Sequence, residues 1–556
     1  MIRSVSVCLV ALVIVSCAVL GPPAKVSRAS GGTVILAWQE PSSLDPLYSS
    51  GTATVATITA LAIEGLLRVG PEGDAEPALA SAVPTLANGG VRLLGSGMEV
   101  TYRLRGGLRW SDGEPFTGED VRYTWHTMMS DPKVSSREGY DLISAIDLPD
   151  ASTVVVRYRQ IYSGYLTRFD AILPAHLLRD KGDAARLAYG RAPLGTGPFR
   201  FVAFAAGEHI IAERNERYRT PGKPLLDTVI FKFVPSVEAA KAQLRAGEVD
   251  VALNVSEADA IELERAGQRL DSAPSPTVEA LSFNTVDPRE PDSGRPHPVL
   301  GDPAVRRALL LATPKQELID RLLGGLAVPG RSEIPLGWSA DRSLVQERAD
   351  PAAAARVLDS AGWAPGLDGI RTKAGVRAKI AIMSTTGNRL REQIQQVLID
   401  RWRDVGVEAT IRNIPSSALT ASWSAGGARK RGDYDVILAN LGLGSSGATD
   451  PQAYLSQRHR CDTIPTGQNK GVGSNFERFC DPRIDRLLEE AGRSIDQQSR
   501  REAYAHVNAI VNEQVLAIWL YEKARINAFG PKIVGDRANA WSVATWNVED
   551  WRLARR

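Results

Sequence analysis

Gly442, Gly444 and Gly447 have the G-x-G-x-x-G spacing of a dinucleotide-binding loop. They follow the apolar run 434–441, which predicts a buried strand, and Asp450-Pro451 can begin a helix. A strand, a glycine loop and a helix in this order could cradle a phosphate. A dinucleotide fold also needs an acid at the end of a second strand, about 20 residues further on. That region, CDTIPTGQNKG, contains turn residues and no predicted strand, which argues against an NAD-dependent enzyme.

Four acidic residues, Asp112, Glu114, Glu119 and Asp120, could form the carboxylate pair of a glycosidase. Thr117 followed three residues later by Asp120 is typical of a helix capping box, and acids in a first helical turn are favoured by the helix dipole. Carboxylates along one turn do not face each other across a substrate. Helix capping therefore explains them. A serine hydrolase is also disfavoured, because no G-x-S-x-G elbow joins a strand to a helix. We identify no catalytic residues and expect no cofactor.

Cys461 and Cys480 could form a disulfide or bind a metal. In an oxidising compartment, two cysteines with 18 residues between them are most simply a disulfide. Closing that loop would contribute roughly 3 kcal/mol to stability. His459 lies nearby, but the set lacks four ligands and paired C-x-x-C spacing, so we expect no metal site. Free thiols remain the alternative.

The N-terminus predicts export. Arg3 is followed by SVSVCLVALVIVS, which is too short to span a bilayer comfortably. The run ends at Ser16-Cys17, which resembles a bacterial lipobox, so residues 1–17 are expected to be a lipoprotein signal peptide with Cys17 as the lipidated residue. The alternative is an ordinary signal peptide with an incidental cysteine. Residues 18–31 are then a flexible tether, and the protein is extracytoplasmic and anchored to the membrane by lipid.

The predicted elements along the chain alternate between strands and helices, which predicts layered α/β lobes. Examples are the strand expected at 281–285 and the helix expected at 236–246, closed by Gly247. A formal net charge of +2 and the lack of a long basic run argue against a nucleic-acid-binding protein.

Several phrases, in this order, resemble the family 5 solute-binding proteins of bacterial ABC importers, the oligopeptide, dipeptide and nickel group. They are SSLDP (42–46), EGLL (64–67), EPALA (76–80), YRLRGGLRWSDGEPFTGEDVRYTW (102–125), LPAHLL (173–178), GTGPFRF (195–201), AAKAQLRAGEVDVAL (239–253), LSFNT (281–285), VRRALL (305–310), AARVLDSAGW (354–363) and NFERFCDPRIDRLLEEA (475–491). Each phrase alone is weak evidence, but the ordered set spans nearly the whole mature chain.

This resemblance implies an α/β, periplasmic-binding-protein-like fold of type II (cluster C), with two lobes, a hinge and an extra domain. Domain I, the first lobe, would comprise 32–75, 198–295 and 525–556. Domain II, the extra domain, would be 76–197, and domain III, the second lobe, 296–524. The implied protein is a monomer that captures a peptide between its lobes and delivers it to the permease of an ABC importer. A non-peptide solute, such as an oligosaccharide or a metal chelate, is the alternative ligand.

The resemblance also implies which residues line the cleft. They are Trp38 and Glu40 from the first strand and loop, Phe283 and Asn284 from LSFNT, and Leu443, Gly444, Ser445, Ser446 and Gly447 from the second-lobe loop. Peptide-binding relatives carry an aspartate for the α-ammonium shortly before the Asp-Pro pair, and an aromatic three positions earlier. Here these positions are Gly447 and Gly444. Either another acid substitutes, with Glu40 as the candidate anchor, or the ligand has no free α-amine. Large aromatics usually bury, and Trp363 is therefore expected in the core.

Overall fold

A computed structural model describes residues 31–48, 53–131, 133–134, 137–443 and 450–554. The predicted signal peptide, Cys17, almost all of the tether, and the cleft candidates Gly444, Ser445, Ser446 and Gly447 lie outside these residues. Across the described part, none of the helices has the length and apolarity that crossing a bilayer requires.

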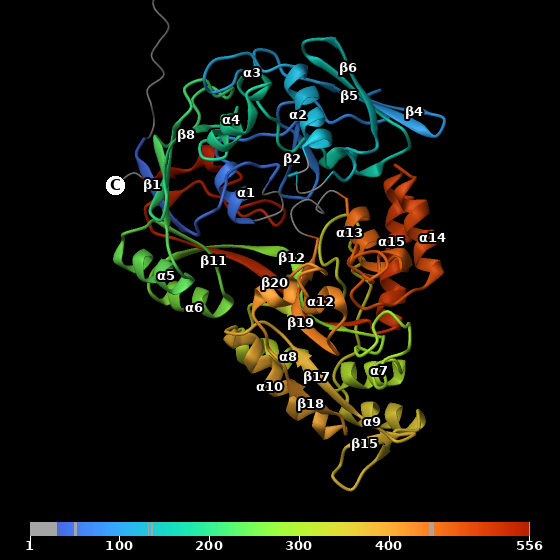
Figure 1. Cartoon of the computed structure of the whole chain (residues 1–556). Coiled ribbons are helices and arrows are strands. Elements are labelled where there is room, and N and C mark those ends of the chain that lie inside the picture. Colours follow the sequence, from blue (N-terminus) through green and yellow to red (C-terminus); the bar gives the residue numbers. More distant parts are fainter. Residues whose placement is uncertain (1–30, 49–52, 132, 135–136, 444–449, 555–556) are drawn as a thin grey trace, which may run out of the picture.

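One mixed sheet of 11 strands runs through the molecule (Figure 1). Its order is β18 (Glu408–Ile411), β17 (Lys379–Met383), β19 (Val436–Gly442), β12 (Arg269–Phe283), β20 (Ala517–Phe529), β11 (Val251–Val255), β1 (Thr33–Trp38), β10 (Thr228–Phe233), β9 (His209–Arg214) and β8 (Phe199–Ala205), and β13 (Val328–Pro329) pairs with β20. The strands from β11 to β8 belong to the first lobe, and those from β18 to β19 to the second.

The long strands β12 and β20 carry the sheet from one lobe to the other. They are antiparallel, and their register shifts between Pro274 and Val278 and again between Glu279 and Ala280. Before the first shift, Arg269 lies opposite Phe529 near the first lobe. After it, residues 277–283 pair with β19 of the second lobe. Bulges bend and twist a strand pair, so the crossing point is a natural place for a hinge.

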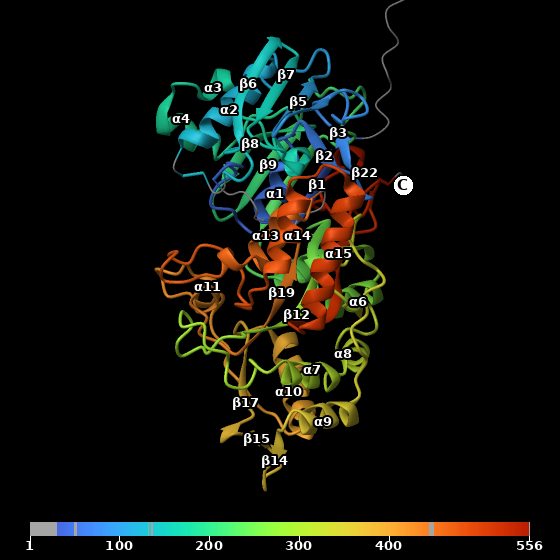
Figure 2. The same ribbon diagram turned by 90° about the vertical axis from the view of Figure 1, so that its right-hand side faces the viewer.

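The extra domain has its own sheet and core. Strands β4 (Val91–Leu94), β5 (Gly97–Arg103), β7 (Thr153–Tyr158) and β6 (Ile143–Asp150) form a four-stranded antiparallel sheet. Helix α2 (Gly118–Ser130) packs beside it (Figure 2). The capping box expected from Thr117 and Asp120 is confirmed: the Asp120 carboxylate accepts from the Thr117 N–H at 2.9 Å.

The remaining elements cover these sheets. The first lobe and the C-terminal segment hold α1 (Ala53–Thr59), β2 (Leu67–Val69), β3 (Ala75–Pro77), α5 (Val237–Ala246), α6 (Glu257–Arg265), β21 (Ile533–Val534), η3 (Val548–Asp550) and β22 (Arg552–Leu553), and the extra domain adds η1 (Ser163–Thr167), α3 (Ala175–Leu178) and α4 (Gly182–Tyr189). The second lobe holds α7 (Pro303–Leu311), α8 (Lys315–Leu322), α9 (Pro351–Ser360), β14 (Ala364–Pro365), β15 (Arg371–Lys373), β16 (Val376–Arg377), α10 (Arg389–Asp404), α11 (Ser416–Thr420), α12 (Ala428–Arg431), α13 (Gln452–His459), η2 (Cys461–Thr463), α14 (Pro482–Gly492) and α15 (Gln497–Glu513).

Hydrophobic clusters follow the same three parts. One joins β1, β8, β10 and the C-terminal Trp551, a second fills the extra domain, and a third lies around β17, β19 and α10. Phe283 belongs to the third cluster, so the end of β12 packs with the second lobe although it falls within 198–295. The domain limits stay a prediction.

Candidate ligand-binding site

A cavity of about 590 Å³ lies where the first lobe, the extra domain and the C-terminal segment meet. Its lining comes from several stretches of chain: residues between 46 and 78 around α1 and β2, residues between 128 and 171 of the extra domain, Pro198 and Tyr218 of the first lobe, and residues between 541 and 549. Ligand sites commonly form at such junctions between domains.

The cavity also borders the second lobe. Trp541 lines it and is buried at 3% exposure within a cluster that includes Leu441 and Leu443 of the second lobe. Val69, another lining residue, packs against the same cluster, and its carbonyl accepts from the Asn539 amide at 3.4 Å. A ligand in the cavity would therefore lie within one side chain's thickness of the second lobe.

Aromatic and aliphatic side chains give the cavity apolar walls. Trp541, Trp546, Tyr140 and Tyr218 lie among them. The Arg68 guanidinium stacks over the Trp546 ring, 5.8 Å from its centre. Broad rings with a polar edge bury large areas of a ligand and still offer hydrogen bonds.

Two carboxylates of the cavity are held by partners. Glu64 forms an ion pair with Arg219 and accepts a hydrogen bond from the Thr196 hydroxyl at 3.0 Å. Glu549 lies 3.6 Å from the Arg68 guanidinium. Burial raises the pKa of both carboxyls, and the neighbouring arginines oppose that rise.

The loop 166–171 places two charged residues on the wall because Phe169, between them, is anchored. Its ring is fully buried and packs edge-on against Tyr140, with ring centres 5.2 Å apart. Its N–H donates to the Tyr140 hydroxyl at 2.7 Å, and its carbonyl accepts from the Leu66 N–H at 2.9 Å. Arg168 and Asp170 consequently flank the anchor and line the cavity.

Gly65 is required where this loop meets the first lobe. A Cβ at Gly65 would lie 2.6 Å from the Asp170 Cα and 2.6 Å from the Phe169 carbonyl oxygen, far inside contact distance. The glycine of the EGLL phrase thus lets the two chains approach, and this contact sets the position of Asp170.

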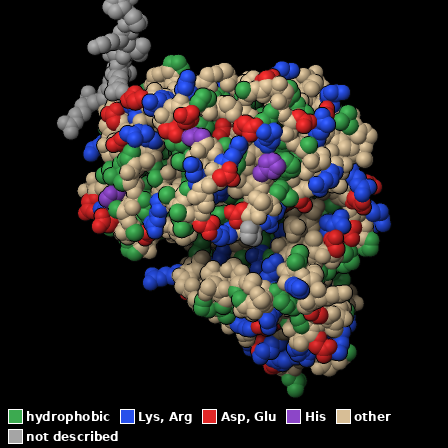
Figure 3. Space-filling view, turned by 45° about the horizontal axis from the view of Figure 1, so that its top comes forward, with side chains coloured by type: hydrophobic (Ala, Val, Ile, Leu, Met, Phe, Trp, Pro, Cys, Tyr) green, Lys and Arg blue, Asp and Glu red, His purple; other side chains and the backbone are tan. Residues whose placement is uncertain are grey.

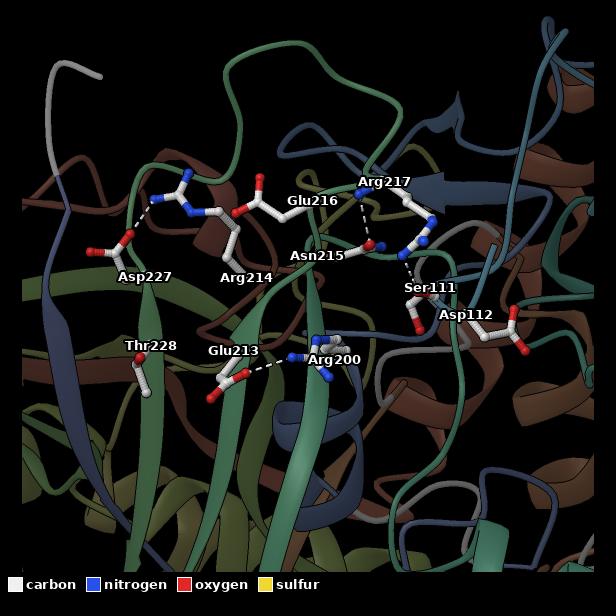
Figure 4. Close-up of a pocket in the computed structure, with 10 residues that line it drawn as sticks. All are labelled: Ser111, Asp112, Arg200, Glu213, Arg214, Asn215, Glu216, Arg217, Asp227 and Thr228. Carbon is white, nitrogen blue, oxygen red and sulfur yellow. Dashed lines mark hydrogen bonds and ion pairs between the residues drawn. The ribbon is translucent and has the colours of Figure 1, made fainter. Parts of the chain in front are cut away.

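A second hollow, of about 640 Å³, lies on the surface of the first lobe beside the extra domain (Figure 4). Two ion pairs join charges of this hollow, Arg200 with Glu213 at 2.7 Å and Arg214 with Asp227 at 2.9 Å. Arg217 donates to the Ser111 carbonyl at 3.3 Å. This groove is open and charge-compensated, so we favour the junction cavity as the ligand site.

The first-lobe candidates lie outside the lining of the junction cavity. Trp38 is buried at 8% exposure in the first-lobe core, where its indole N–H donates to the Thr54 carbonyl at 3.0 Å. Glu40 is exposed and accepts from the Gly207 N–H at 3.1 Å in the β8–β9 turn. Glu40 is therefore not our candidate for a ligand anchor in this cavity.

The candidates Phe283, Asn284 and Leu443 are buried and make contacts within the protein. Phe283 is fully buried in the second-lobe core. The Asn284 amide donates to the carbonyls of Gly432 and Tyr434, at 3.1 and 2.9 Å. Leu443 is 5% exposed and its N–H donates to the Pro276 carbonyl at 3.1 Å. Trp363 is confirmed as a core residue at 1% exposure.

The glycine motif also has a structural explanation at its first position. Gly442 ends β19 with a φ of 147°, and a Cβ there would lie 2.2 Å from the Pro276 carbonyl oxygen. Asp450 is buried and forms an ion pair with Arg500, and its carboxylate accepts from the Gln452 N–H at 3.0 Å. Gly442 and Asp450 thus have structural contacts, while Gly444 and Gly447 lie outside the described residues.

Cys461 and Cys480 are joined in a disulfide, with their Cα atoms 4.7 Å apart. The neighbouring His459 is buried and hydrogen-bonds to Glu333. Within the described residues, no three His, Cys, Asp or Glu side chains gather in an arrangement that could hold a metal ion.

The family resemblance placed the ligand contacts on the first strand and loop, on LSFNT and on the second-lobe loop, so it did not predict the residues of this cavity. Two signals were present in the motifs themselves: EGLL contains Glu64 and Gly65, and Asp170 lies three residues before LPAHLL. Trp541 and Trp546 had no local signal, since only the fold brings the C-terminal segment to the cavity.

Comparison with known proteins agrees with this architecture. The sequence profile of the bacterial extracellular solute-binding proteins, family 5 middle region, matches residues 77–463. Protein XP55 of Streptomyces lividans is 28% identical over 86% of this chain and 81% of its own, and the oligopeptide-binding protein AppA of Bacillus subtilis is 25% identical over 95% and 92%. The structure of AppA with a nonapeptide aligns with a TM-score of 0.73 at 23% identity, covering 95% of this chain and 99% of that one. NikA of Brucella suis with Fe(III)-EDTA aligns at 0.78 and 20%, covering 94% and 100%.

The sheet topology and the likeness to these structures define a two-lobed α/β fold of the periplasmic-binding type, which confirms the fold class expected from the sequence. The chain belongs to family 5 of the bacterial extracellular solute-binding proteins. This is a substrate-binding transport family that serves ABC importers, and its members work outside the cytoplasm.

Proposed function

We propose that this protein captures peptides in the junction cavity and delivers them to the permease of an ABC importer. The observation that carries the proposal is the cavity itself: it has aromatic walls and a few fixed charges, and it lies between the first lobe and the extra domain and borders the second lobe through Trp541. Relatives whose names describe peptide binding support the peptide assignment. Such a protein binds and releases its cargo without chemical turnover.

We further propose that the protein is held outside the cytoplasm by a lipid on Cys17. The support is the lipobox-like end of the N-terminal apolar run, together with a family whose members are extracytoplasmic. The domain limits expected from the sequence belong to the same proposal, with the crossing strands β12 and β20 as the hinge. The protein would work as a monomer.

Tryptophan fluorescence tests the ligand class, because Trp541 and Trp546 line the cavity. A pool of random tri- to pentapeptides should change the emission of the purified protein and raise its melting temperature. A binding ligand at 100 times its Kd stabilises the fold by about 2.7 kcal/mol. Oligosaccharides and the nickel–histidine chelate are the comparison ligands. A response to either of these, with none to peptides, would exclude the peptide assignment.

A further inference from the structure

Asp170 differs from the other acids of the cavity in its surroundings. Its carboxylate lies near its own backbone N–H and that of Ala171, and Arg168 acts on it only from beyond ion-pair distance. Among the described residues no basic side chain forms an ion pair with it. Glu64 and Glu549, by contrast, lie against Arg219 and Arg68. The Asp170 surface is open to water in the cavity wall, while protein surrounds it on the other sides.

The nearest guanidinium is directed elsewhere. Arg168 donates to the Glu138 carbonyl at 2.6 Å and to the Thr167 hydroxyl at 2.8 Å, and it stacks over the Tyr140 ring at 5.5 Å. Three interactions fix the Arg168 side chain in this position, short of a contact with the Asp170 carboxylate. These contacts keep the Arg168 guanidinium from forming an ion pair with the Asp170 carboxylate.

We propose that Asp170 binds an ammonium group of the ligand, which makes it a specificity-determining residue of the extra domain. The inference rests on the proposed function and names the part of the peptide that this wall recognises. An ammonium donates up to three hydrogen bonds and carries the positive charge that complements the Asp170 carboxylate. A carboxylate end of the ligand would be repelled at this wall.

The energetics favour such a ligand group. Burial raises the pKa of the Asp170 carboxyl, and Arg168 only partly opposes the rise. A charged ligand group at this carboxylate stabilises its ionised form, so binding should lower that pKa and release protons. Acidification should then weaken binding. The charged and titratable groups around Asp170 are Arg168, Glu138, Tyr140, Glu64, Arg68 and Glu549.

Two variants and two peptide pools test the inference. The pools are random tri- to pentapeptides without lysine, either with a free N-terminus or N-acetylated. Wild-type protein should bind the free pool at least about tenfold more tightly, as expected for a charge-assisted hydrogen bond. Asp170→Asn should weaken binding of the free pool by a similar factor and abolish the preference. Asp112→Asn, which changes an exposed acid of the surface groove, should retain both.

The source of the ammonium is resolved by a third pool, N-acetylated but containing lysine. Tight binding of that pool, lost in Asp170→Asn, assigns the site to a side-chain ammonium. Unchanged affinity and preference in Asp170→Asn would overturn the inference while leaving peptide capture intact. Failure of wild-type protein to bind any pool would instead overturn the proposed function.

A measurement on wild-type protein guards against a variant that fails to fold. Calorimetry at pH 5 in two buffers of different ionisation enthalpy should show protons released when the free pool binds. Affinity for that pool should fall from pH 7 to pH 5. Binding without proton release, and with the same affinity at both pH values, would overturn the inference without any mutation.

Discussion

Phe169 shows how one buried ring can position two charged neighbours. Because its ring and both backbone polar groups are held, the adjacent residues have little freedom, and Arg168 and Asp170 lie at the cavity wall in defined places. Arg168 is held further by its stacking on Tyr140. A binding site built this way loses little conformational entropy on capturing a ligand.

Lys315 gives a residue-level prediction about pH. It is buried at 9% exposure and donates to the Gly330 carbonyl at 3.2 Å and to Gln346, and in the described part of the chain no acid forms an ion pair with it. Burial lowers the pKa of this amine to about 7. Between that value and the unfolded pKa of about 10.4, the unfolded chain binds a proton that the folded chain does not. The free energy of unfolding therefore rises with pH across this range.

Urea unfolding of Lys315→Met against wild-type protein measures this effect. The advantage of the variant over wild type should be largest near pH 6.5 and shrink towards pH 9.5, because methionine has no charge to bury. Lys181→Met, at an exposed lysine, is the control and should show a difference that does not change with pH. A constant difference between Lys315→Met and wild type would contradict the prediction.

At the scale of elements, the ends of a helix could be predicted from local sequence, but the full extent of a long strand could not. Ser236 and Gly247 enclose α5 as expected, since a serine cap and a left-handed glycine at φ 73° are local signals. Strand β12 was expected only at its end, because Pro274 and Pro276 argue against a strand interior. The register shift between Pro274 and Val278 is how the sheet accommodates them. The cavity could not be predicted, since its walls come from distant segments.

Gly442 yields a prediction for the crossing region. An alanine there must adopt a φ of 147° and clash with the Pro276 carbonyl of β12. Gly442→Ala should therefore lower the free energy of unfolding by more than about 1 kcal/mol in urea denaturation. Gly530→Ala, just after β20, is the matched control, because its new Cβ would meet nothing closer than 3.4 Å. Equal stability of the two variants would contradict the steric argument.

At the scale of the whole molecule, the surface charge argues against nucleic-acid binding, and the sheet shows how the two lobes are connected. The face shown in Figure 3 mixes acidic and basic side chains, in keeping with a net charge of +2, and gives no single-sign field for a nucleic acid. The continuous sheet instead connects the two lobes through one crossing region. Among the described strands, β12 and β20 carry the sheet across, and the register of their pairing shifts there.

Ligand capture should therefore change the relation between the lobes rather than their internal structure. The cavity touches the first lobe and the extra domain directly and the second lobe through Trp541, so a bound peptide favours whichever arrangement brings these walls together. Small-angle X-ray scattering should show a smaller radius of gyration with a saturating peptide pool than without it. Asp170→Asn, at a pool concentration that saturates only wild-type protein, should keep the larger value. An unchanged radius in wild-type protein, at a concentration where fluorescence shows full binding, would mean that β12 and β20 act as a rigid connection and not as a hinge.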